Sequence, residues 1–425
     1  MPIGISDLDR LREIVGNLTR RAPADVQADS WPTEYGLDSL SLLIFREQCE
    51  RAFNISISDE HWADMSTLSD IAEYLESSRE HGSLSQRTTL GTSNVSLTPQ
   101  WATNSLVEHM EIGMPLTGIN HLSESALLKY LGDLRWRHVA RLTGVQSRDM
   151  TDVSGNRLYP TFFYVESAFP QDRPMACYGE NDTFQMVDSV KRFGSSMLDG
   201  TSYLIPPGKQ DSITHSLDGI ADAVLLGIPA VRMSNIFVMQ FNGAEWLKKG
   251  RPREGLIENI RELPTAPDSH TIVKQAETNG YIDVPGPEYI PLNDIPLEFE
   301  YHVQPDRDVN GAGLLYFANY PVFLDLGERN ALNRVQPAWP DELINKRTIV
   351  NRKIAYLNNA SWKDILRITT QVWVKPPSSD ADLSIASVRI YSNQKIHRQS
   401  DGRLMCVSSA NKLLYGVAAE ELQWS

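Results

Sequence analysis

The chain of 425 residues is longer than a single hydrophobic core usually sustains, so its length predicts two or three domains. Its formal net charge of −14 argues against nucleic acid or an anionic membrane as the main partner. The first 80 residues hold seven Lys and Arg against 16 Asp and Glu, and so account for −9 of this charge. A small acidic domain, residues 1–80, is therefore expected to precede a nearly balanced body.

The N-terminal residues and the apolar stretches bear on the protein's location. The sequence MPIGISDLDRL lacks a basic segment followed by an apolar one, so no secretory signal is expected. The most apolar stretch, GIADAVLLGIPAV, is too short to cross a bilayer and contains Asp222. Cys49, Cys177 and Cys406 are widely spaced without a metal-type pairing. Reduced thiols, no metal site, no membrane contact and a cytoplasmic location are expected.

Three amphipathic stripes run through the acidic domain. Their apolar residues recur at helical spacing: Leu8, Leu11, Val15 and Leu18, then Leu42, Phe45, Cys49 and Ala52, then Leu68, Ile71 and Leu75. Ser6 and Asp7 can cap the first helix. A long loop with Pro23, Trp31 and Pro32 joins the first stripe to the second, which predicts a small helical bundle.

Residues 35–43, YGLDSLSLL, place Ser39 between Asp38 and the second stripe. On the residues alone, Ser39 or Asp38 can cap a helix. The longer segment YGLDSLSLLIFREQCERAFNISISDEHWADMSTLSDIAEYL, residues 35–75, resembles an acyl carrier protein. That resemblance implies that Ser39 carries 4′-phosphopantetheine, whose thiol holds acyl groups as thioesters. A phosphodiester at the start of a helix would meet free N–H groups and the positive end of the helix dipole.

Residues 81–105 contain ten Ser or Thr in 25 positions and show almost no apolar period. This composition predicts a flexible linker between the acidic domain and a body of residues 106–425.

The body repeats one order of elements in two approximate halves, 106–290 and 291–425. In the first half a strand over 106–115 precedes a helix that opens at Ser123, and strand-like runs follow in LYPTFFYVESAF, TFQMVDSVKRFG and SNIFVMQFNG. In the second half a strand over 297–303 precedes a helix near 311–329, and the runs that follow are DILRITTQVWV, LSIASVRIY and LMCVSSANKLLYG. A strand, one long helix and several antiparallel strands form a hot-dog unit. Two copies predict an α+β double hot dog.

The body also resembles the leinamycin-pathway bifunctional acyltransferase/decarboxylase family. The segments that carry the likeness are NHLSESALLKYLGDLRW, RLYPTFFYV, YGENDTF, KRFGSS and DVNGAGLLYFANYPVFLDLGER. The family has a double hot-dog fold, decarboxylates methylmalonyl-CoA and delivers propionyl to a carrier thiol in polyketide assembly. The resemblance therefore implies a coenzyme A thioester as substrate. It also implies an acyl carrier protein, fused or separate, and polyketide synthase modules as partners.

Tyr159, in the R-L-Y segment, is the main catalytic candidate. The residues alone favour a half-buried strand tyrosine. The resemblance implies a nucleophile, although a phenol needs activation to attack a thioester. Whether Tyr159 becomes acylated or only donates a hydrogen bond to the thioester stays open.

Decarboxylation needs donors at the thioester oxygen, where the negative charge of an enolate develops. Helix N-termini supply such donors, and the two long helices of the body are expected to begin at NHLSES and DVNGAG. The secondary candidates are His121, Ser123, Asn310 and Gly311, with Asn181 of the G-E-N-D segment. Helix capping by Ser123 and a turn at Gly311 are the plainer alternatives.

Several basic residues can be weighed as contacts for coenzyme A phosphates. They are Arg135, Arg137, Lys248, Lys249 and Arg251, and a solvated face is the expectation for each. His138 falls on the apolar stripe of the first long helix, so a core position is expected.

Other functions stay open at this level. No G-x-S-x-G segment is present, so a serine acyltransferase is not supported. The alternatives are a hot-dog dehydratase or thioesterase, and a non-catalytic domain that binds acyl groups on its own carrier. The sequence does not distinguish malonyl-CoA from methylmalonyl-CoA, loading within one chain from loading between chains, or a monomer from a homodimer.

Overall fold

The computed structural model describes residues 6–80 apart from 54 and 56, 105–209 apart from 120, and residues 217, 219–241, 246–375, 388–415 and 417. It divides into two compact units, one built mainly from Met1–Leu97 and one from Thr98–Arg192 with Ser196–Ser425. The expected linker, residues 81–105, lies outside the described residues except for Ser105, which begins a strand.

The smaller unit is a helical bundle of α1 (Asp7–Thr19), α2 (Ser39–Phe53), α3 (Asp59–Asp64) and α4 (Leu68–Glu80). Ser6 caps α1, because its side chain accepts a hydrogen bond from the amide of Asp9. The three expected stripes meet in one core that includes the buried Leu11, Phe45 and Ile71. The short helix α3 is an addition to the three that the stripes predict. The bundle expected from the sequence is confirmed.

The first half of the larger unit contains one long helix and a set of antiparallel strands. These are β1 (Ser105–Glu111), α5 (Glu124–Thr143), β2 (Tyr159–Ala168), β3 (Thr183–Phe193), β4 (Met197–Ile205), β5 (Ala230–Phe241) and β6 (Trp246–Lys249), with the short α6 (Ile220–Leu225) before β5. Ser123 is the N-cap of α5, as expected, and accepts a hydrogen bond from the amide of Ala126 at 3.4 Å. The strand β4 is an element that the sequence did not predict.

The second half repeats this order after α7 (Asp268–Asn279). It contains β7 (Ile290–Pro291), β8 (Leu297–His302), α8 (Pro305–Asp308), α9 (Tyr320–Val335), α10 (Asp341–Asn345), β9 (Arg347–Tyr356), β10 (Ile365–Lys375), β11 (Arg389–Arg398) and β12 (Leu404–Leu414). The expected start of its long helix near residue 311 is wrong. The helix begins at Tyr320, with Pro321 in its first turn, where a missing N–H costs nothing.

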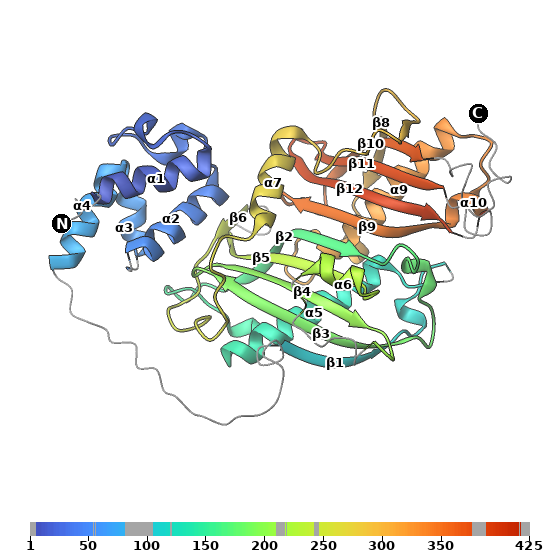
Figure 1. Ribbon diagram of the computed structural model, residues 1–425, viewed down its shortest axis with the longest axis horizontal. Coiled ribbons are helices and arrows are strands. Elements are labelled where there is room, and N and C mark those ends of the chain that lie inside the picture. Colours follow the sequence, from blue (N-terminus) through green and yellow to red (C-terminus); the bar gives the residue numbers. More distant parts are fainter. Residues whose placement is uncertain are drawn as a thin grey trace. The chain divides into compact units, whose positions relative to one another are not determined.

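The described strands form one twelve-stranded sheet that runs through both halves. Its order is β1-β3-β4-β5-β2-β9-β12-β11-β10-β7, with β6 beside β5 and β8 beside β10. The halves join where β2 pairs with β9 antiparallel, from Tyr164 opposite Ala355 to Ala168 opposite Asn351. Figure 1 shows this continuous sheet, from β1 through β2 and β9 to β10.

The two long helices cover one face of this sheet and α7 covers the other. Arg352 of β9 forms ion pairs with Glu124 of α5 and with Asp325 of α9, which places both helices on one side. On the opposite side, Ser234 of β5 bonds Ser269 of α7 at 2.9 Å. Each half is therefore a sheet wrapped along one helix, and the double hot-dog arrangement is confirmed (Figure 1).

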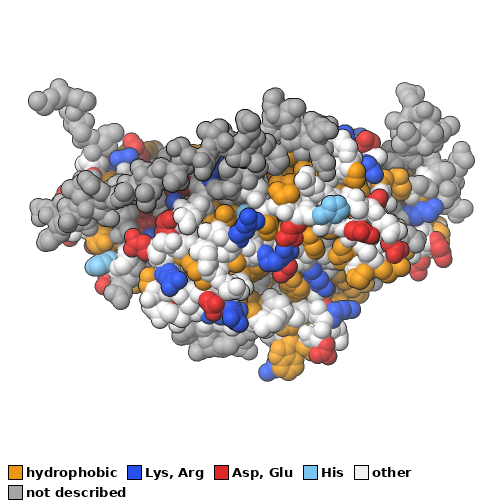
Figure 2. Space-filling view, turned by 90° about the horizontal axis from the view of Figure 1, so that it is seen from below, with side chains coloured by type: hydrophobic (Ala, Val, Ile, Leu, Met, Phe, Trp, Pro, Cys, Tyr) orange, Lys and Arg blue, Asp and Glu red, His pale blue; other side chains and the backbone are white. Residues whose placement is uncertain are grey.

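The surface is of mixed character. On the described residues of the face in Figure 2, basic side chains are interspersed with acidic and hydrophobic ones. Within the described part of the chain, no helix is both long enough and apolar enough to span a bilayer.

Candidate active site

Ser39 is the first residue of the 15-residue helix α2. Asp38 caps this helix, since its Oδ1 accepts a hydrogen bond from the amide of Ser41 at 2.7 Å. The backbone carbonyl of Asp38 also accepts a hydrogen bond from the amide of Leu42 at 2.8 Å. The helix start therefore fits a phosphodiester on Ser39, because first-turn amides and the positive end of the dipole favour an anion there.

A cavity of about 1000 Å³ lies where the two halves of the larger unit meet. The first half contributes α5, the start of β2 and the ends of β5 and β6. The second half contributes residues 307–317, the end of β9 and the turn between β11 and β12. These segments lie together because β2 and β9 are neighbours in the sheet.

Tyr159, the first residue of β2, lies on the wall of this cavity. It is opposite Val238 of β5, which in turn is opposite Lys249 of β6. Paired residues project from the same face of a sheet, so the three side chains form a row, and all three line the cavity. The backbones of Tyr159 and Lys249 are thus roughly 10 Å apart, two strand spacings. No described residue bonds the Tyr159 hydroxyl, which leaves it available to a ligand.

A guanidinium lies beside this phenol. The Cζ atom of Arg157 is 4.7 Å from the centroid of the Tyr159 ring, and both residues line the cavity. The cation is favourably placed over the electron-rich face of the ring. An anion that binds at Arg157 therefore also lies next to Tyr159.

Opposite the strands, residues 308–315 form a tight turn built around Asn310. Asn310 Oδ1 accepts hydrogen bonds from the amides of Ala312 at 3.0 Å and Leu314 at 3.1 Å. Because this side-chain atom accepts from two N–H groups, it is the oxygen of the Asn310 amide. The nitrogen of that side-chain amide is therefore the atom that can donate hydrogen bonds to other groups. Gln240 of β5 donates to the carbonyl of Ala312 and so ties the turn to the strand beside Tyr159.

Part of the cavity wall is aromatic. The rings of Phe162 and Phe317 stack with centroids 4.0 Å apart, and Tyr320 and Tyr356 extend this wall. Gly132 of α5 makes room for the stack, because a Cβ atom there would lie 2.9 Å from Cζ of Phe317. Burial raises the pKa values of Tyr320 and Tyr356, so both phenols stay protonated and can donate hydrogen bonds but not act as phenolates.

The lining is rich in positive charge. Its cationic residues are Lys129, Arg157, Lys249, Arg307, Arg398 and Arg403, whereas Asp133 is the one carboxylate among the described lining residues. A basic cavity in a chain of net charge −14 suits an anionic ligand. Two of the basic residues that were expected to be solvated can be placed here. Lys249 is one of the cationic residues of the cavity lining. Arg137 is partly exposed and forms ion pairs with Glu108 and Asp133. The other three arginines of the lining, Arg307, Arg398 and Arg403, lie in no recognisable sequence motif.

The structure brings three of the predicted site residues together. Tyr159, Asn310 and Gly311 line one cavity. Asn310 and Gly311 belong to the turn and not to a helix N-terminus. The sequence-based expectation that they supply donors at the start of the second long helix is therefore wrong.

The other three predicted residues do not line the cavity. His121 has its Nδ1 2.8 Å from the carbonyl oxygen of Leu122, and Ser123 caps α5. Asn181 is exposed in a turn with a left-handed φ of 71°. In that conformation Asn is one of the better-tolerated residues. The cap at Ser123 is the plainer alternative stated for that residue from the sequence.

A buried ionic cluster lies between α5 and the first half of the sheet. Arg135 bonds Asp188 of β3 at 2.9 Å, and Nδ1 of His138 is 2.7 Å from the same carboxylate. The expectation of a solvated Arg135 is wrong, whereas the core position of His138 is confirmed. Ser202 of β4 also donates to Asp188, at 2.6 Å.

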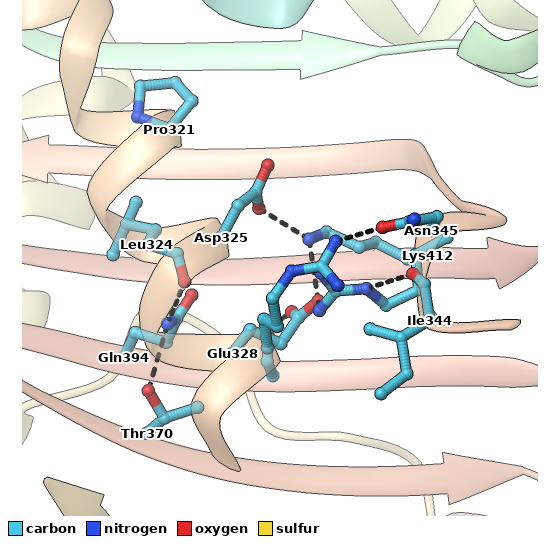
Figure 3. A network of polar contacts seen from close by, with 12 residues as sticks. Pro321, Leu324, Asp325, Glu328, Ile344, Asn345, Thr370, Gln394 and Lys412 are labelled. Carbon is cyan, nitrogen blue, oxygen red and sulfur yellow. Dashed lines mark hydrogen bonds and ion pairs between the residues drawn. The ribbon is translucent and has the colours of Figure 1, made fainter. Parts of the chain in front are cut away.

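A second buried cluster lies between α9 and the second half of the sheet. Figure 3 shows Lys412 between Asp325 and Glu328, to which its Nζ donates at 2.6 and 2.7 Å. Nearby, Gln394 donates to the carbonyl of Leu324 at 2.7 Å and to Thr370 at 3.0 Å (Figure 3). The charged groups of both clusters are paired within the protein and hold the helices to the sheet, which leaves the cavity as the candidate site. No group of three or more potential metal ligands occurs among the described residues.

Residues 9–75 match the family model of the phosphopantetheine attachment site. The N-terminal unit is a carrier domain. Its cofactor is covalent 4′-phosphopantetheine, and α2 begins within the matched residues. No curated protein matches the chain in sequence.

The body is similar to solved thioesterase structures at low identity. A protein described as an oleoyl thioesterase from Lactobacillus plantarum is 11% identical with a TM-score of 0.49, over 75% of this chain and 99% of its own. An acyl-ACP thioesterase from Bacteroides thetaiotaomicron is 10% identical with a TM-score of 0.41, over 73% and 98%. A 12:0-ACP thioesterase from Umbellularia californica is 10% identical with a TM-score of 0.40, over 73% and 97%. Likeness at this level assigns no activity.

Proposed function

We propose that the body is an acyl-thioester enzyme that decarboxylates malonyl-CoA or methylmalonyl-CoA and transfers the resulting acetyl or propionyl group to a carrier thiol. Such a step would supply an acyl unit to polyketide synthase modules. One observation carries the proposal. The hydroxyl of Tyr159 and the side-chain amide nitrogen of Asn310 can both donate hydrogen bonds to a ligand in the same cavity, whose lining is rich in basic residues. The family resemblance of the body sequence supports the same reaction.

The donors suit the electron flow of decarboxylation. When the bond from the α-carbon to the carboxylate breaks, carbon dioxide leaves and the electron pair passes into the thioester as an enolate. The Tyr159 hydroxyl and the Asn310 amide would bond the enolate oxygen, and preorganised donors of this kind stabilise developing charge. The aromatic wall of Phe162 and Phe317 removes water from part of the site, which strengthens these interactions. A proton then adds to the α-carbon and completes the acyl thioester.

Transfer needs an acceptor, and the carrier domain provides one. The 4′-phosphopantetheine group on Ser39 supplies the thiol that exchanges with coenzyme A at the acyl carbonyl. The same donors from Tyr159 and Asn310 would hold that carbonyl while coenzyme A leaves as its thiol. In a two-step variant, Tyr159 would first take the acyl group as an ester and then pass it on. The two variants make different predictions for a phenylalanine at this position.

The lining favours this chemistry over dehydration or hydrolysis. No described histidine lines the cavity, so the described lining offers no imidazole base for either reaction. Asp133 is exposed and bonded to Arg137 at 2.8 Å. Decarboxylation needs no base, because the breaking bond between the α-carbon and the carboxylate provides the electron pair.

The test is intact-protein mass spectrometry of the pantetheinylated full-length chain given methylmalonyl-CoA or malonyl-CoA. We expect propionyl or acetyl on the arm and release of carbon dioxide. Tyr159→Phe removes one hydroxyl at a half-buried strand position, so circular dichroism should be unchanged. If Tyr159 is a covalent nucleophile, loading should be nearly abolished. If it only donates a hydrogen bond, loading should slow by roughly 10²–10³-fold.

Tyr130→Phe is the matched control, because Tyr130 is also half-buried but lies outside the cavity lining. It should load at the wild-type rate. Intact methylmalonyl on the wild-type arm would show a transferase without decarboxylation. No loading from any carboxyacyl-CoA would favour the non-catalytic acyl-binding alternative.

A further inference from the structure

We infer that Arg157 is the residue that selects carboxylated acyl groups, by pairing with the α-carboxylate of the incoming thioester beside Tyr159. The inference rests on the proposed function and goes further, since it assigns the recognition of the group that is later lost. It also assigns Arg157 an effect on binding that is separate from any effect on the rate of the chemical step.

The position of Arg157 is set by a rigid turn. The carboxylate of Asp152 accepts hydrogen bonds from the amides of Ser154 at 2.9 Å and Asn156 at 2.7 Å, and from the side chain of Asn156 at 2.9 Å. Arg157 follows directly and pairs with Thr151 in an isolated β-bridge. The next amide, of Leu158, bonds the carbonyl of Met150 at 2.9 Å. The backbone is therefore fixed on both sides of Arg157, which directs its side chain over Tyr159.

No carboxylate in the described part of the chain neutralises the charge of Arg157. Arg157 forms no ion pair with any described carboxylate, in contrast to two other arginines of the lining. Arg307 bonds Asp308 at 3.0 Å, and Arg398 bonds Asp401 at 2.6 Å. Arg157 is also exposed at the cavity, so a ligand carboxylate can reach it without breaking an existing bond.

The place beside Tyr159 identifies the ligand group. If the thioester carbonyl bonds the Tyr159 hydroxyl, a carboxylate on the α-carbon lies only two bonds from that carbonyl carbon. The guanidinium 4.7 Å from the Tyr159 ring is then within reach of this carboxylate. An arginine presents two parallel donors to a carboxylate, which gives geometric selectivity as well as attraction. A simple acyl thioester has no group to make this contact.

An ion pair with a departing carboxylate has a definite kinetic signature. The carboxylate carries a full charge in the bound substrate and loses it as neutral carbon dioxide forms. Arg157 would therefore stabilise the ground state more than the transition state, which improves binding without raising the maximal rate. Loss of Arg157 should weaken binding of the carboxylated substrate by roughly 10–100-fold, as expected for a charge-assisted hydrogen bond. The maximal rate should stay the same or rise.

The experiment measures the rate of propionyl loading on the pantetheinylated full-length chain against methylmalonyl-CoA concentration, for the wild type and Arg157→Gln. We expect a half-saturating concentration raised by roughly 10–100-fold, an undiminished maximal rate, and unchanged affinity for propionyl-CoA in direct titrations. Arg173→Gln is the matched control. Arg173 is likewise exposed and its Cζ lies 5.1 Å from the ring centroid of Tyr178, but both residues lie outside the cavity lining.

A lowered maximal rate at unchanged half-saturation, or equal losses for methylmalonyl-CoA and propionyl-CoA, would overturn the assignment. If the wild type does not decarboxylate any carboxyacyl-CoA, the proposed function fails, but the role of Arg157 in binding carboxylated thioesters can still be tested. Titration of the chain without its arm then compares methylmalonyl-CoA with propionyl-CoA. A preference for the carboxylated thioester that disappears in Arg157→Gln supports the assignment, and a preference that persists contradicts it.

Discussion

Arg135 of α5 and Asp188 of β3 form an ion pair at 2.9 Å, with 1% and 0% of their side chains exposed. Each charge is satisfied further, by the carbonyl of Met233 on the arginine and by His138 and Ser202 on the carboxylate. A buried pair of this kind contributes little net stability compared with apolar residues, but removal of one partner leaves an uncompensated charge in the core. The pair therefore fixes how α5 lies on the sheet.

Asp188→Asn should lower the free energy of unfolding of the larger unit by about 3–5 kcal/mol, because Arg135 would keep its charge without a counter-ion. Urea denaturation followed by circular dichroism measures this change. Asp149→Asn is the control, since Asp149 lies in an exposed pair with Arg148 at 3.6 Å and should change stability by less than about 1 kcal/mol. Similar small losses in both variants would show that the buried pair is unimportant.

Two buried carboxylates should give pH dependences of opposite sign. Burial opposes ionisation of Asp188, but Arg135 and His138 outweigh it and hold the pKa of Asp188 well below its usual value of 3.8. The stability that Asp188 contributes is therefore present above about pH 4 and lost as the pH falls. Burial raises the pKa of Glu124 above its usual 4.5, and Arg352 offsets this only partly. Stability linked to Glu124 is therefore greatest below pH 4.5 and falls as the pH rises through the raised pKa.

Urea unfolding at a series of pH values tests this contrast. The free energy of unfolding of the wild type should exceed that of Asp188→Asn by less as the pH falls below 4. Relative to Glu124→Gln, the free energy of unfolding of the wild type should fall as the pH rises above 4.5. Parallel pH profiles for the two variants would contradict the assignment. The comparison with variants removes the contribution of titrating groups that do not interact with the substituted residue.

The repeated order of elements was predictable because it depends on local pattern. Alternation in β10, where every second residue from Leu366 to Val374 is buried, is visible in the sequence. The start of α9 was not, because Asn310 bonds two amides of its own turn, so the helix begins at Tyr320 and not near residue 311. The strand β4 was missed because Leu198 and Tyr203 are both buried, on opposite faces, so no clean alternation remains.

The candidate site was predictable only in part. Tyr159 came from a family resemblance, since nothing in its own neighbourhood distinguishes it from a structural tyrosine. Lys249 reaches the cavity through the pairing of β2, β5 and β6, and a strand register over 90 residues cannot be derived from one sequence. Arg135 was misplaced for a similar reason, because its partner Asp188 is 53 positions away.

Gly132→Ala should narrow the cavity. The added Cβ would lie 2.9 Å from Cζ of Phe317, whose ring is stacked on Phe162. We expect the Phe317 ring to move into the cavity to relieve this contact. Alanine gains about 1 kcal/mol in helix propensity over glycine, which offsets part of the overpacking cost of about 1–3 kcal/mol. We therefore expect a small change in stability but weaker binding of propionyl-CoA by calorimetric titration.

The control for this substitution is Gly113→Ala, where the nearest atom to the new Cβ is 3.6 Å away. This variant should bind propionyl-CoA as the wild type does. If Gly132→Ala also binds normally, the aromatic wall does not contact the ligand.

Ser39 is predicted to carry the phosphopantetheine arm. A phosphopantetheinyl transferase with coenzyme A should add one arm to the full-length chain, and Ser39→Ala should abolish the mass increase. Ser6→Ala is the control, since Ser6 also lies at a helix start of the carrier but caps α1. An arm on the Ser39→Ala protein would move the attachment site to another residue.

Asn310→Asp tests the proposed donor at the enolate oxygen. The substitution keeps an oxygen that can accept from the amides of Ala312 and Leu314, so the turn should survive, and thermal unfolding should confirm this. It replaces the free amide nitrogen by a second oxygen, which cannot donate and would repel a developing negative charge. Propionyl loading from methylmalonyl-CoA should therefore slow by roughly 10²–10³-fold or more. Affinity for propionyl-CoA should change much less, because the neutral carbonyl needs this donor less than the enolate does. Loading at the wild-type rate in a correctly folded Asn310→Asp protein would leave the turn with a structural role only.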